Sequence, residues 1–463
     1  MTRANEAVDG EGEFLAPPQA PPNLNIPPST STVSVSVIDT GVRLSLPAAH
    51  FLHPPISPPK ARVTGPAYAF LVTHQSSGAK LLFDLSVRKD HTSGFAPAVQ
   101  RLVDDPASEF WVRWVETDSV ASASASAAAG EVSGERGERQ GEVAARPRDV
   151  VDVLEAAGVD VAAGEVEAVV WSHAHFDHTG DVTRFPAEKT KLVVGPGFRE
   201  AFGEGWPRVE EAPVKGVEWE GRELVEVRFE GAGRIGRFRA RDWWGDGSFY
   251  LLDTPGHAVG HLCGLARVRA GAAAGEEAFV FMGGDCAHHP AQFRPSPYLP
   301  LPTTITPSPF PPQSRHHHHG ALSCPGCLFT PIHPAAATTE KPAAAAATTP
   351  FYRPSRTLPH NFDDCLWSID GLEEFDADER VLVVNAHDES LLRLLYDDED
   401  GNGNGNGKEG EAEAGEAKAE AEAGRKNKKW VWPQGTLDGW REAGLATRGR
   451  WAFLGDFEGA VGA

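Results

Sequence analysis

The chain has 463 residues and a formal net charge of −22 at pH 7, which is long enough for one large domain or two ordinary ones. The acidic balance argues against nucleic acid or an anionic membrane surface as the main partner, because phosphate binding requires a basic face. Five cysteines are too few, and odd in number, for the disulfide framework of a small secreted protein. Residues 1–30 lack the apolar segment of a signal peptide, and no run reaches the about 18 apolar residues of a membrane span. We therefore expect a cytoplasmic protein.

Along the chain, alternating or continuous apolar runs predict a series of short strands separated by short helices. Residues 1–30, rich in proline pairs, are expected to be disordered. The expected strands are 33–37, 68–73, 80–85, 167–171, 191–194, 225–229 and 249–251. The expected helices are 150–157 and one that begins within 196–202, and tryptophan-rich residues 430–457 are expected to pack.

Three segments of biased composition interrupt this pattern. They lie at about 118–146 (Ala, Ser, Gly, Glu and Arg), 303–349 (Pro, then Ala and Thr) and 397–428 (Gly-Asn repeats and acidic residues). Such compositions are typical of solvated insertions, and a loop as long as the second is unusual inside a compact domain. The expected organisation is a domain over residues 31–460 with three low-complexity insertions.

The stretch 172–181 has the highest density of metal-ligand residue types in the chain. It reads Ser-His-Ala-His-Phe-Asp-His-Thr-Gly-Asp, so three histidines and an aspartate fall within six residues. Imidazole and carboxylate are the ligands of catalytic zinc and similar cations. The stretch follows the expected strand 167–171, so the ligands leave the end of a strand in a tight loop. The first two histidines alternate to one side and the aspartate and third histidine turn to another point, so one loop can contribute to two adjacent metals.

Three later apolar runs also end in a candidate ligand. The motifs are Asp-Thr-Pro-Gly-His ending at His257, Phe-Val-Phe-Met-Gly-Gly-Asp ending at Asp285, and Val-Leu-Val-Val-Asn-Ala-His ending at His387. Strand ends are where loops converge on a site that a rigid sheet supports. All four motifs therefore predict one shared site.

His-x-His-x-Asp-His, followed in order by the other three motifs, resembles the metallo-β-lactamase superfamily. The resemblance spans roughly residues 33–456. It implies an α+β fold, the four-layer αββα sandwich of two sheets packed face to face with helices outside. The strand pattern alone indicates only mixed α and β structure.

The resemblance also implies a ligand set for two divalent metal ions, most readily zinc. One metal would take His173, His175 and His257, the other Asp177, His178 and His387, and Asp285 would bridge the two. Asp177 would count as catalytic as well as metal-binding. Two metals would lower the pKa of a bridging water towards neutrality and polarise a substrate carbonyl. The implied activity is hydrolysis of a lactone, ester or thioester of a small molecule by metal-bound hydroxide.

The residue type at position 285 distinguishes branches of the superfamily that the chain resembles. True β-lactamases of this fold carry Cys or Ser at this place, whereas a bridging Asp resembles the lactonases and glyoxalase II-type thioesterases. The phrase Thr-Pro-Gly-His-Ala-Val-Gly-His at 254–261 also resembles acyl-homoserine lactonases. Two other functions stay open. One is a metal-binding scaffold whose cleft is closed by residues 303–349, and the other is an oxidoreductase that uses iron at the same site.

Three further residues are candidates for supporting roles. Asp84 resembles the early strand-end Asp that holds a ligand His, although it could simply cap a turn. His261 is expected beside the ligands rather than among them. His288 stands three residues after Asp285, where acyl-homoserine lactonases have a substrate-contacting Tyr, so homoserine-lactone specificity is in doubt. An imidazole could still donate to an oxyanion or protonate a leaving group, or it could only pack, while adjacent His289 should point elsewhere.

Two conspicuous motifs receive no function. The four-histidine run at 316–319 belongs to a low-complexity segment. Cys324-Pro-Gly-Cys327 is a lone CxxC without a second pair, which indicates two ordinary thiols.

Overall fold

The computed structural model describes residues 13–57, 60–117, 145–271, 275–310, 322–337, 342–396 and 430–461. Most of the expected insertion at 118–146, all of that at 397–428, and the four-histidine run at 316–319 lie outside the described residues. No helix among the described residues is long and apolar enough to cross a membrane.

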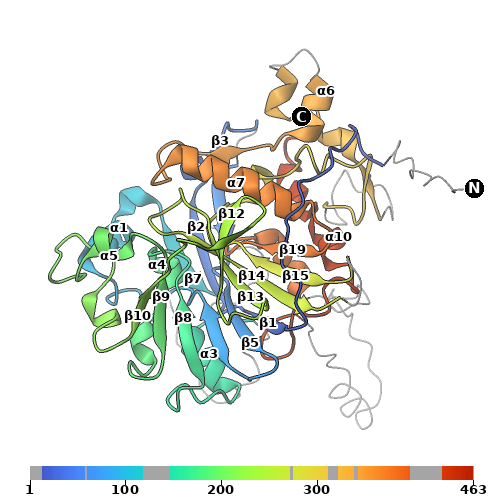
Figure 1. The fold of residues 1–463 in the computed structure, drawn as a ribbon. Coiled ribbons are helices and arrows are strands. Elements are labelled where there is room, and N and C mark those ends of the chain that lie inside the picture. Colours follow the sequence, from blue (N-terminus) through green and yellow to red (C-terminus); the bar gives the residue numbers. More distant parts are fainter. Residues whose placement is uncertain are drawn as a thin grey trace, which may run out of the picture.

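Two six-stranded sheets form the centre of the molecule (Figure 1). In spatial order the first contains β1 (Val33–Ile38), β5 (Ala69–His74), β6 (Lys80–Phe83), β8 (Val166–Val170), β9 (Lys191–Val194) and β10 (Leu224–Glu226). Its first three strands pair antiparallel and the others parallel. Parallel strands are covered on both faces, which is why β8 and β9 are largely apolar in the sequence.

The second sheet is mostly antiparallel. In spatial order it contains β11 (Gly233–Ile235), β12 (Phe238–Asp242), β13 (Phe249–Asp253), β14 (Leu262–Arg269), β15 (Ala278–Met282) and β19 (Val381–Val384). Only β19 joins its neighbour, β15, in parallel. Because β15 and β19 run in the same direction, the residues that follow them emerge at the same edge.

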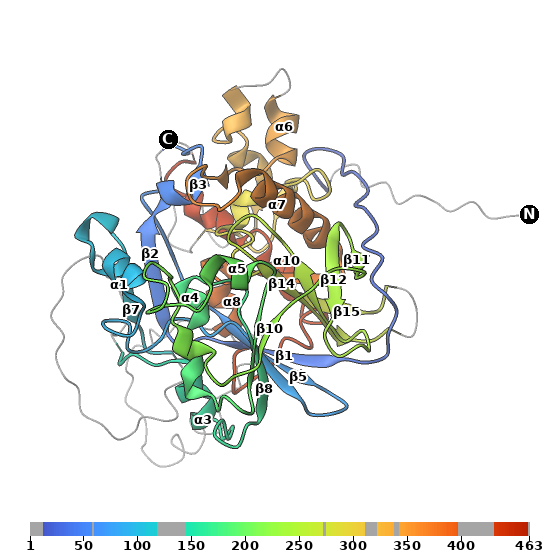
Figure 2. The same cartoon turned by 60° about the vertical axis from the view of Figure 1, so that its left-hand side comes forward.

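Side chains that alternate along the strands build the layers. Phe70 and Val170 of the first sheet share one buried cluster with Leu251 and Val280 of the second, so these faces pack against each other. The opposite faces are covered by helices: α3 (Val150–Ala156) and α5 (Phe198–Phe202) on the first sheet, and α7 (Phe362–Asp376) on the second. Figures 1 and 2 show α7 across the second sheet and α3 on the far side of the first. The expected αββα sandwich is confirmed.

The remaining elements lie around this sandwich. The strands are β2 (Val42–Pro47), β3 (Leu52–His53), β4 (Arg62–Gly65), β7 (Trp111–Trp114), β16 (Thr304–Ile305), β17 (Cys324–Pro325) and β18 (Arg353–Pro354). The helices are α1 (Pro97–Asp104), α4 (Phe176–Thr179), α6 (Pro342–Thr348), α8 (Leu392–Tyr396) and α10 (Leu445–Gly449). Strands β4, β2 and β7 form a small antiparallel sheet, and α1 lies on the same side of the molecule (Figure 2).

The N-terminal segment differs from the expected disordered tail. Of residues 1–30, the structure describes 13–30, and these pack on the domain. Leu24 is 1% exposed, the Leu15 N–H donates to the Leu301 carbonyl at 2.9 Å, and the Pro27 carbonyl accepts from the Arg267 guanidinium at 2.5 Å. Proline-rich composition predicted disorder, but a few buried side chains and backbone hydrogen bonds are enough to hold this segment against an existing surface.

The described parts of 303–349 contain more regular structure than the composition indicated. Strands β16 and β17 pair, and helix α6 buries Ala346 and Ala347. Cys324 is buried and Cys327 exposed, and both are free thiols.

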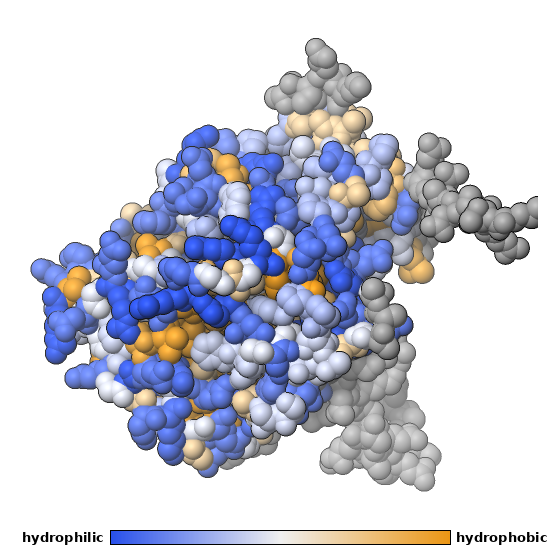
Figure 3. All heavy atoms as spheres, viewed as in Figure 1, coloured by the Kyte–Doolittle hydropathy of each residue, from blue (hydrophilic) through white to orange (hydrophobic). Residues whose placement is uncertain are grey.

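In the view of Figure 3, hydrophilic residues cover most of the surface and hydrophobic residues form separate groups.

Helix α7 carries a buried carboxyl group that should make stability depend on pH. Burial raises the pKa of Glu373 from 4.5 to about 8, although Arg353 lowers it. The side chain is 8% exposed, and its Oε1 has no hydrogen bond to any described residue. The folded state thus holds this proton more tightly than the unfolded chain does, so the free energy of unfolding should fall as pH rises between 4.5 and about 8.

We therefore expect Glu373→Gln to remove this dependence and to stabilise the protein at pH 8.5 by on the order of 2–4 kcal/mol. Urea denaturation of both proteins at pH 5 and pH 8.5 measures the difference. Equal stability of the variant and the parent at pH 8.5 would contradict the assignment.

Candidate metal centre

The predicted ligands meet where four strands end. The stretch after β8 supplies His173 and His175 and, within α4, Asp177 and His178. The β13–β14 turn supplies His257, and the ends of β15 and β19 supply Asp285 and His387. Gly256 permits the close turn before His257, because its φ is +122° and a Cβ there would lie 2.0 Å from the Cys365 nitrogen. The seven candidate ligands form two groups: His173, His175, His257 and Asp285, and Asp177, His178 and His387.

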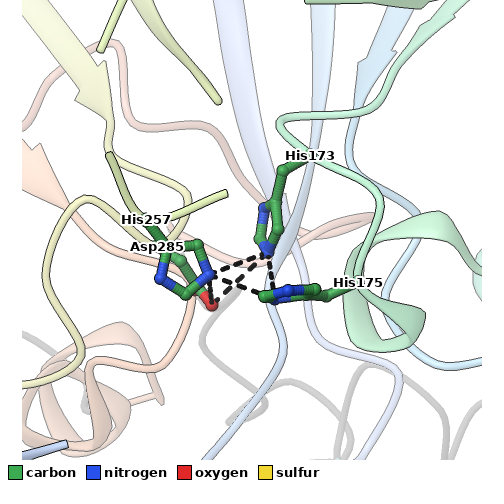
Figure 4. Close-up of side chains that lie close together, drawn as sticks. All are labelled: His173, His175, His257 and Asp285. Atoms are coloured by element: carbon green, nitrogen blue, oxygen red, sulfur yellow. Dashed lines mark hydrogen bonds and ion pairs between the residues drawn. The ribbon is translucent and has the colours of Figure 1, made fainter. Parts of the chain in front are cut away.

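The first group converges on one point, as Figure 4 shows. The Nε2 atom of His173 lies 2.8 Å from Nδ1 of His175 and 3.2 Å from Nε2 of His257. His257 Nε2 lies 3.1 Å from His175 Nδ1 and 3.3 Å from Oδ2 of Asp285. Ligands about 2.0–2.1 Å from a tetrahedral zinc are separated by about 3.3 Å, so these spacings fit one cation.

The second group lies on the other side of the same carboxylate. Oδ1 of Asp285 is 3.0 Å from Nε2 of His387 and 3.2 Å from Nε2 of His178. Oδ2 of Asp177 lies 3.4 Å from His387 Nε2. The two oxygens of Asp285 thus face different groups, as a bridging ligand requires.

Atoms without hydrogen bonds support the fit to metal ions. Nε2 of His178 and Oδ1 of Asp285 are buried and make no hydrogen bond to any described residue. A buried polar atom left unpaired is costly, and a cation between the two groups would coordinate both atoms. Moreover, Nε2 of His173, Nδ1 of His175 and Nε2 of His257 face one another. Hydrogen bonds among these three nitrogens cannot pair all of them at once. The donor set therefore fits two divalent cations.

Asp84 lies directly behind this centre. Its Oδ2 is 2.8 Å from Nδ1 of His178, and its Oδ1 accepts from the Ser172 N–H at 2.7 Å. The residue has a φ of +63° and is completely buried. Fixing Nδ1 leaves Nε2 of His178 free to face a metal, which is the usual role of a carboxylate behind a ligand histidine.

His261 and the Pro66 carbonyl hold two other parts of the site. Nε2 of His261 accepts from the Asp285 N–H at 3.0 Å, so its proton is on Nδ1, near the Thr254 carbonyl at 3.1 Å. Burial lowers the pKa of His261 to about 3, which keeps the ring neutral. Nδ1 of His387 donates to the Pro66 carbonyl at 2.7 Å.

In the first group the charge states favour cation binding, whereas in the second group burial lowers the pKa of His178 and His387 but Asp285 raises it. Burial lowers the pKa of both His173 and His257 well below the ordinary value, so these rings stay neutral. Burial would raise the pKa of Asp285, but His178 and His387 lower it well below the ordinary value. The Asp285 carboxylate is therefore ionised.

The adjacent histidines after Asp285 point in different directions, as expected. Nε2 of His288 is 3.3 Å from Oδ2 of Asp285, and its ring packs on Phe51 with centroids 4.6 Å apart. Nε2 of His289 instead lies 2.8 Å from Oδ2 of Asp456 near the C-terminal end. Only His288 faces the candidate centre.

A cavity of about 360 Å³ opens onto both groups of ligands. It reaches His175, Asp177, His257, Asp285, His288 and His387. Its other walls are mostly apolar and were not foreseen from the sequence: Leu44, Leu46, Phe51, Val63, Val99, Leu102, Phe176 and Leu358. The alternation of apolar and polar residues at 42–46 was the available signal for the β2 wall.

Aromatic side chains brace the metal-ligand loop against this wall. Phe176, between His175 and Asp177, packs edge-on against Phe95 and Phe110, each with centroids 5.3 Å apart. The ligand loop is therefore fixed by the segments that also build the cavity.

We expect Asp84→Asn to weaken metal binding by about 10–100-fold, the usual effect of changing a group that orients a ligand. Asn tolerates the positive φ, and its oxygen can still accept from the Ser172 N–H, but its amide nitrogen would then face Nδ1 of His178 and cannot accept from it. Competition with a chelator measures the change. Unaltered metal affinity would show that Asp84 serves only the local turn.

Comparison with known proteins agrees with this geometry. The family model described as metallo-beta-lactamase superfamily matches residues 137–275. Gamma-lactamase FDB1 of Fusarium pseudograminearum (strain CS3096) is 38% identical over 382 residues, which cover 80% of this chain and 78% of the relative. Metallo-hydrolase mfmC of Annulohypoxylon moriforme is 34% identical over 449 residues, 96% of this chain and 92% of the relative.

A third relative has a higher sequence identity over a shorter region. Gamma-lactamase MBL2 of Gibberella moniliformis (strain M3125 / FGSC 7600) is 46% identical over 188 residues, 40% of this chain and 73% of the relative. With relatives of this similarity along most of its length, the expectation of a hydrolase is confirmed, and the chain belongs to the metallo-beta-lactamase superfamily.

Proposed function

We propose that this protein is a dinuclear metal-dependent hydrolase that opens a lactone, ester or thioester bond in a small molecule. The observation that carries the proposal is the position of Asp285, whose two oxygens face two separate groups of candidate ligands. Imidazole and carboxylate donors at these spacings suit zinc, which is the metal we propose.

Two divalent cations at this centre would supply Lewis-acid activation of water and of a carbonyl oxygen. Asp177 and Asp285 would balance only part of their charge. The remaining positive charge suits a substrate whose carbonyl oxygen becomes negative during the reaction.

His288 is the side chain best placed to act on the substrate. It lines the cavity beside the centre, and its backbone N–H donates to Oε1 of Gln292 at 2.7 Å, which holds the residue in position. Its imidazole can donate a hydrogen bond to the developing oxyanion or give a proton to the departing oxygen or sulfur.

Relatives named gamma-lactamases extend the candidate substrates to cyclic amides. Lactams and lactones share a carbonyl within a ring, so the same site could open either.

The cavity favours an enzyme over a metal-binding scaffold, because it connects the centre with space for a small molecule among the described residues. A scaffold closed by residues 303–349 would lack that space. An oxidoreductase that uses iron remains the alternative on the same ligands, since His and Asp sites accept several metals.

A substrate panel on metal-analysed protein tests the proposal. It should contain lactones, lactams, thioesters and aryl esters, each assayed with zinc-loaded protein. We expect turnover of at least one class that disappears with a chelator and returns with zinc. Full metal content without turnover would support the scaffold, and oxygen uptake by iron-loaded protein would support the oxidoreductase.

A further inference from the structure

The floor of the cavity is one face of the β2–β4 pair. Leu44 lies opposite Gly65 and Leu46 opposite Val63, so the side chains of these strands that share a face point into the cavity. Gly65 is required here, because a Cβ would lie 2.6 Å from the His387 carbonyl oxygen. The apolar floor therefore reaches the metal centre without a gap.

Cationic side chains of the same strands lie on the opposite face. Arg62 donates to Oγ of Ser45 at 2.8 Å, and Arg43 donates to Oδ1 of Asp39 at 3.0 Å. None of the described residues that line the cavity is Lys or Arg, and its charged or ionisable groups all belong to the centre or to His288. An anionic group that lies on this floor, away from the candidate metal ligands, would therefore lose its water without gaining a cationic partner.

Helix α1 completes the cavity. Val99 and Leu102 of this helix both line the cavity. Val99 is buried, whereas 56% of the surface of Leu102 is exposed to solvent. The neighbouring Arg101 turns away and pairs with Oε2 of Glu211 at 2.5 Å. The cavity rim is thus also apolar.

We propose that the substrate is an uncharged, apolar lactone, lactam or ester, and that acyl carriers bearing carboxylates or phosphates are excluded by the β2–β4 floor and by Leu102. This inference rests on the proposed function and narrows it. Burial of an unpaired carboxylate is strongly unfavourable, so the discrimination should be large.

Two esters with the same leaving group test it: 4-nitrophenyl hexanoate and mono-4-nitrophenyl adipate, whose acyl arms are equally long but end in a methyl group and a carboxylate. After correction for spontaneous hydrolysis, kcat/KM for the hexanoate should exceed that for the adipate by at least about 100-fold. Equal values would overturn the inference while leaving the proposed function intact.

Leu102→Lys tests the cavity rim. Because the Leu102 side chain is largely exposed to solvent, we expect this substitution to leave the fold intact. It should raise kcat/KM for the adipate relative to the hexanoate by about two- to fivefold, the strength of an exposed ion pair. Val217→Lys is the matched control, because Val217 is 54% exposed but lies outside the cavity lining. The same ratio in the Leu102 variant and the control would show that Leu102 does not select substrates.

If metal-loaded protein hydrolyses neither ester, the proposed function fails for these substrates, and a binding measurement then tests the inference without catalysis. Calorimetry should detect binding of γ-nonalactone, a neutral lactone with an alkyl arm, to the protein. Leu46→Asp should weaken its binding at least about tenfold, since it places a charge in the apolar floor, whereas Val217→Asp should not. Absence of lactone binding, or equal effects of the two variants, would overturn the inference.

Discussion

Asp285→Ala should cost the protein at least one of its two metal ions and lower turnover by at least about 10³-fold, because metal activation would be lost with the bridge. No other candidate ligand offers atoms to both groups. Its Oδ2 is 3.3 Å from Nε2 of His257 and its Oδ1 is 3.0 Å from Nε2 of His387. Removal of this carboxylate also removes part of the negative charge that would balance two cations in a buried site.

Metal analysis and turnover of the purified variant measure both effects. Asp253→Ala is the matched control, because Asp253 is also a buried aspartate at a strand end but pairs with Arg239 instead of the centre. We expect the control to keep two metals. An Asp285 variant that binds two metals and stays within tenfold of wild-type activity would refute the bridging role.

His288→Ala should keep both metals and lower turnover by about 10²-fold, which is the usual contribution of one oxyanion donor or general acid. Its ring faces the cavity and lies 3.3 Å from Oδ2 of Asp285, but it belongs to neither group of candidate ligands. A direct role predicts a fall in kcat without loss of metal, whereas a packing role predicts lower stability with little change in kcat.

Two further variants separate these roles. His288→Tyr replaces one donor by another and should recover activity to within about tenfold of wild type. His289→Ala should change turnover little, because His289 pairs with Asp456 outside the cavity. Unchanged turnover in His288→Ala with confirmed metal content would remove this residue from the mechanism.

The parts of the fold that sequence reasoning found are those with strong local signals. Strands β8 and β9 are largely apolar runs, and helix α3 begins directly after Asp149, whose side chain caps it. The seven candidate ligands also lie together in the structure, and each of their motifs follows an apolar run in the sequence. Local signals therefore sufficed to predict that these residues share one place in the fold.

The cavity was not foreseen because its walls come from segments far apart in the sequence. Strand β2, helix α1 and Leu358 each contribute a few ordinary apolar side chains, which local patterns cannot assign to one site. The docked segment 13–30 was missed for a similar reason. Leu24 is one of a few apolar residues in a proline-rich stretch, and its burial depends on a surface that other elements provide.

Titration of metal-depleted protein with zinc, with hydrolysis followed at each step, tests the central claim most directly. The substrate should be the one that the panel identifies. The account predicts that activity rises until two zinc ions are bound per chain and that Asp285→Ala does not reach this plateau. Full activity with one zinc ion per chain, or no hydrolysis after two have bound, would contradict a dinuclear hydrolase.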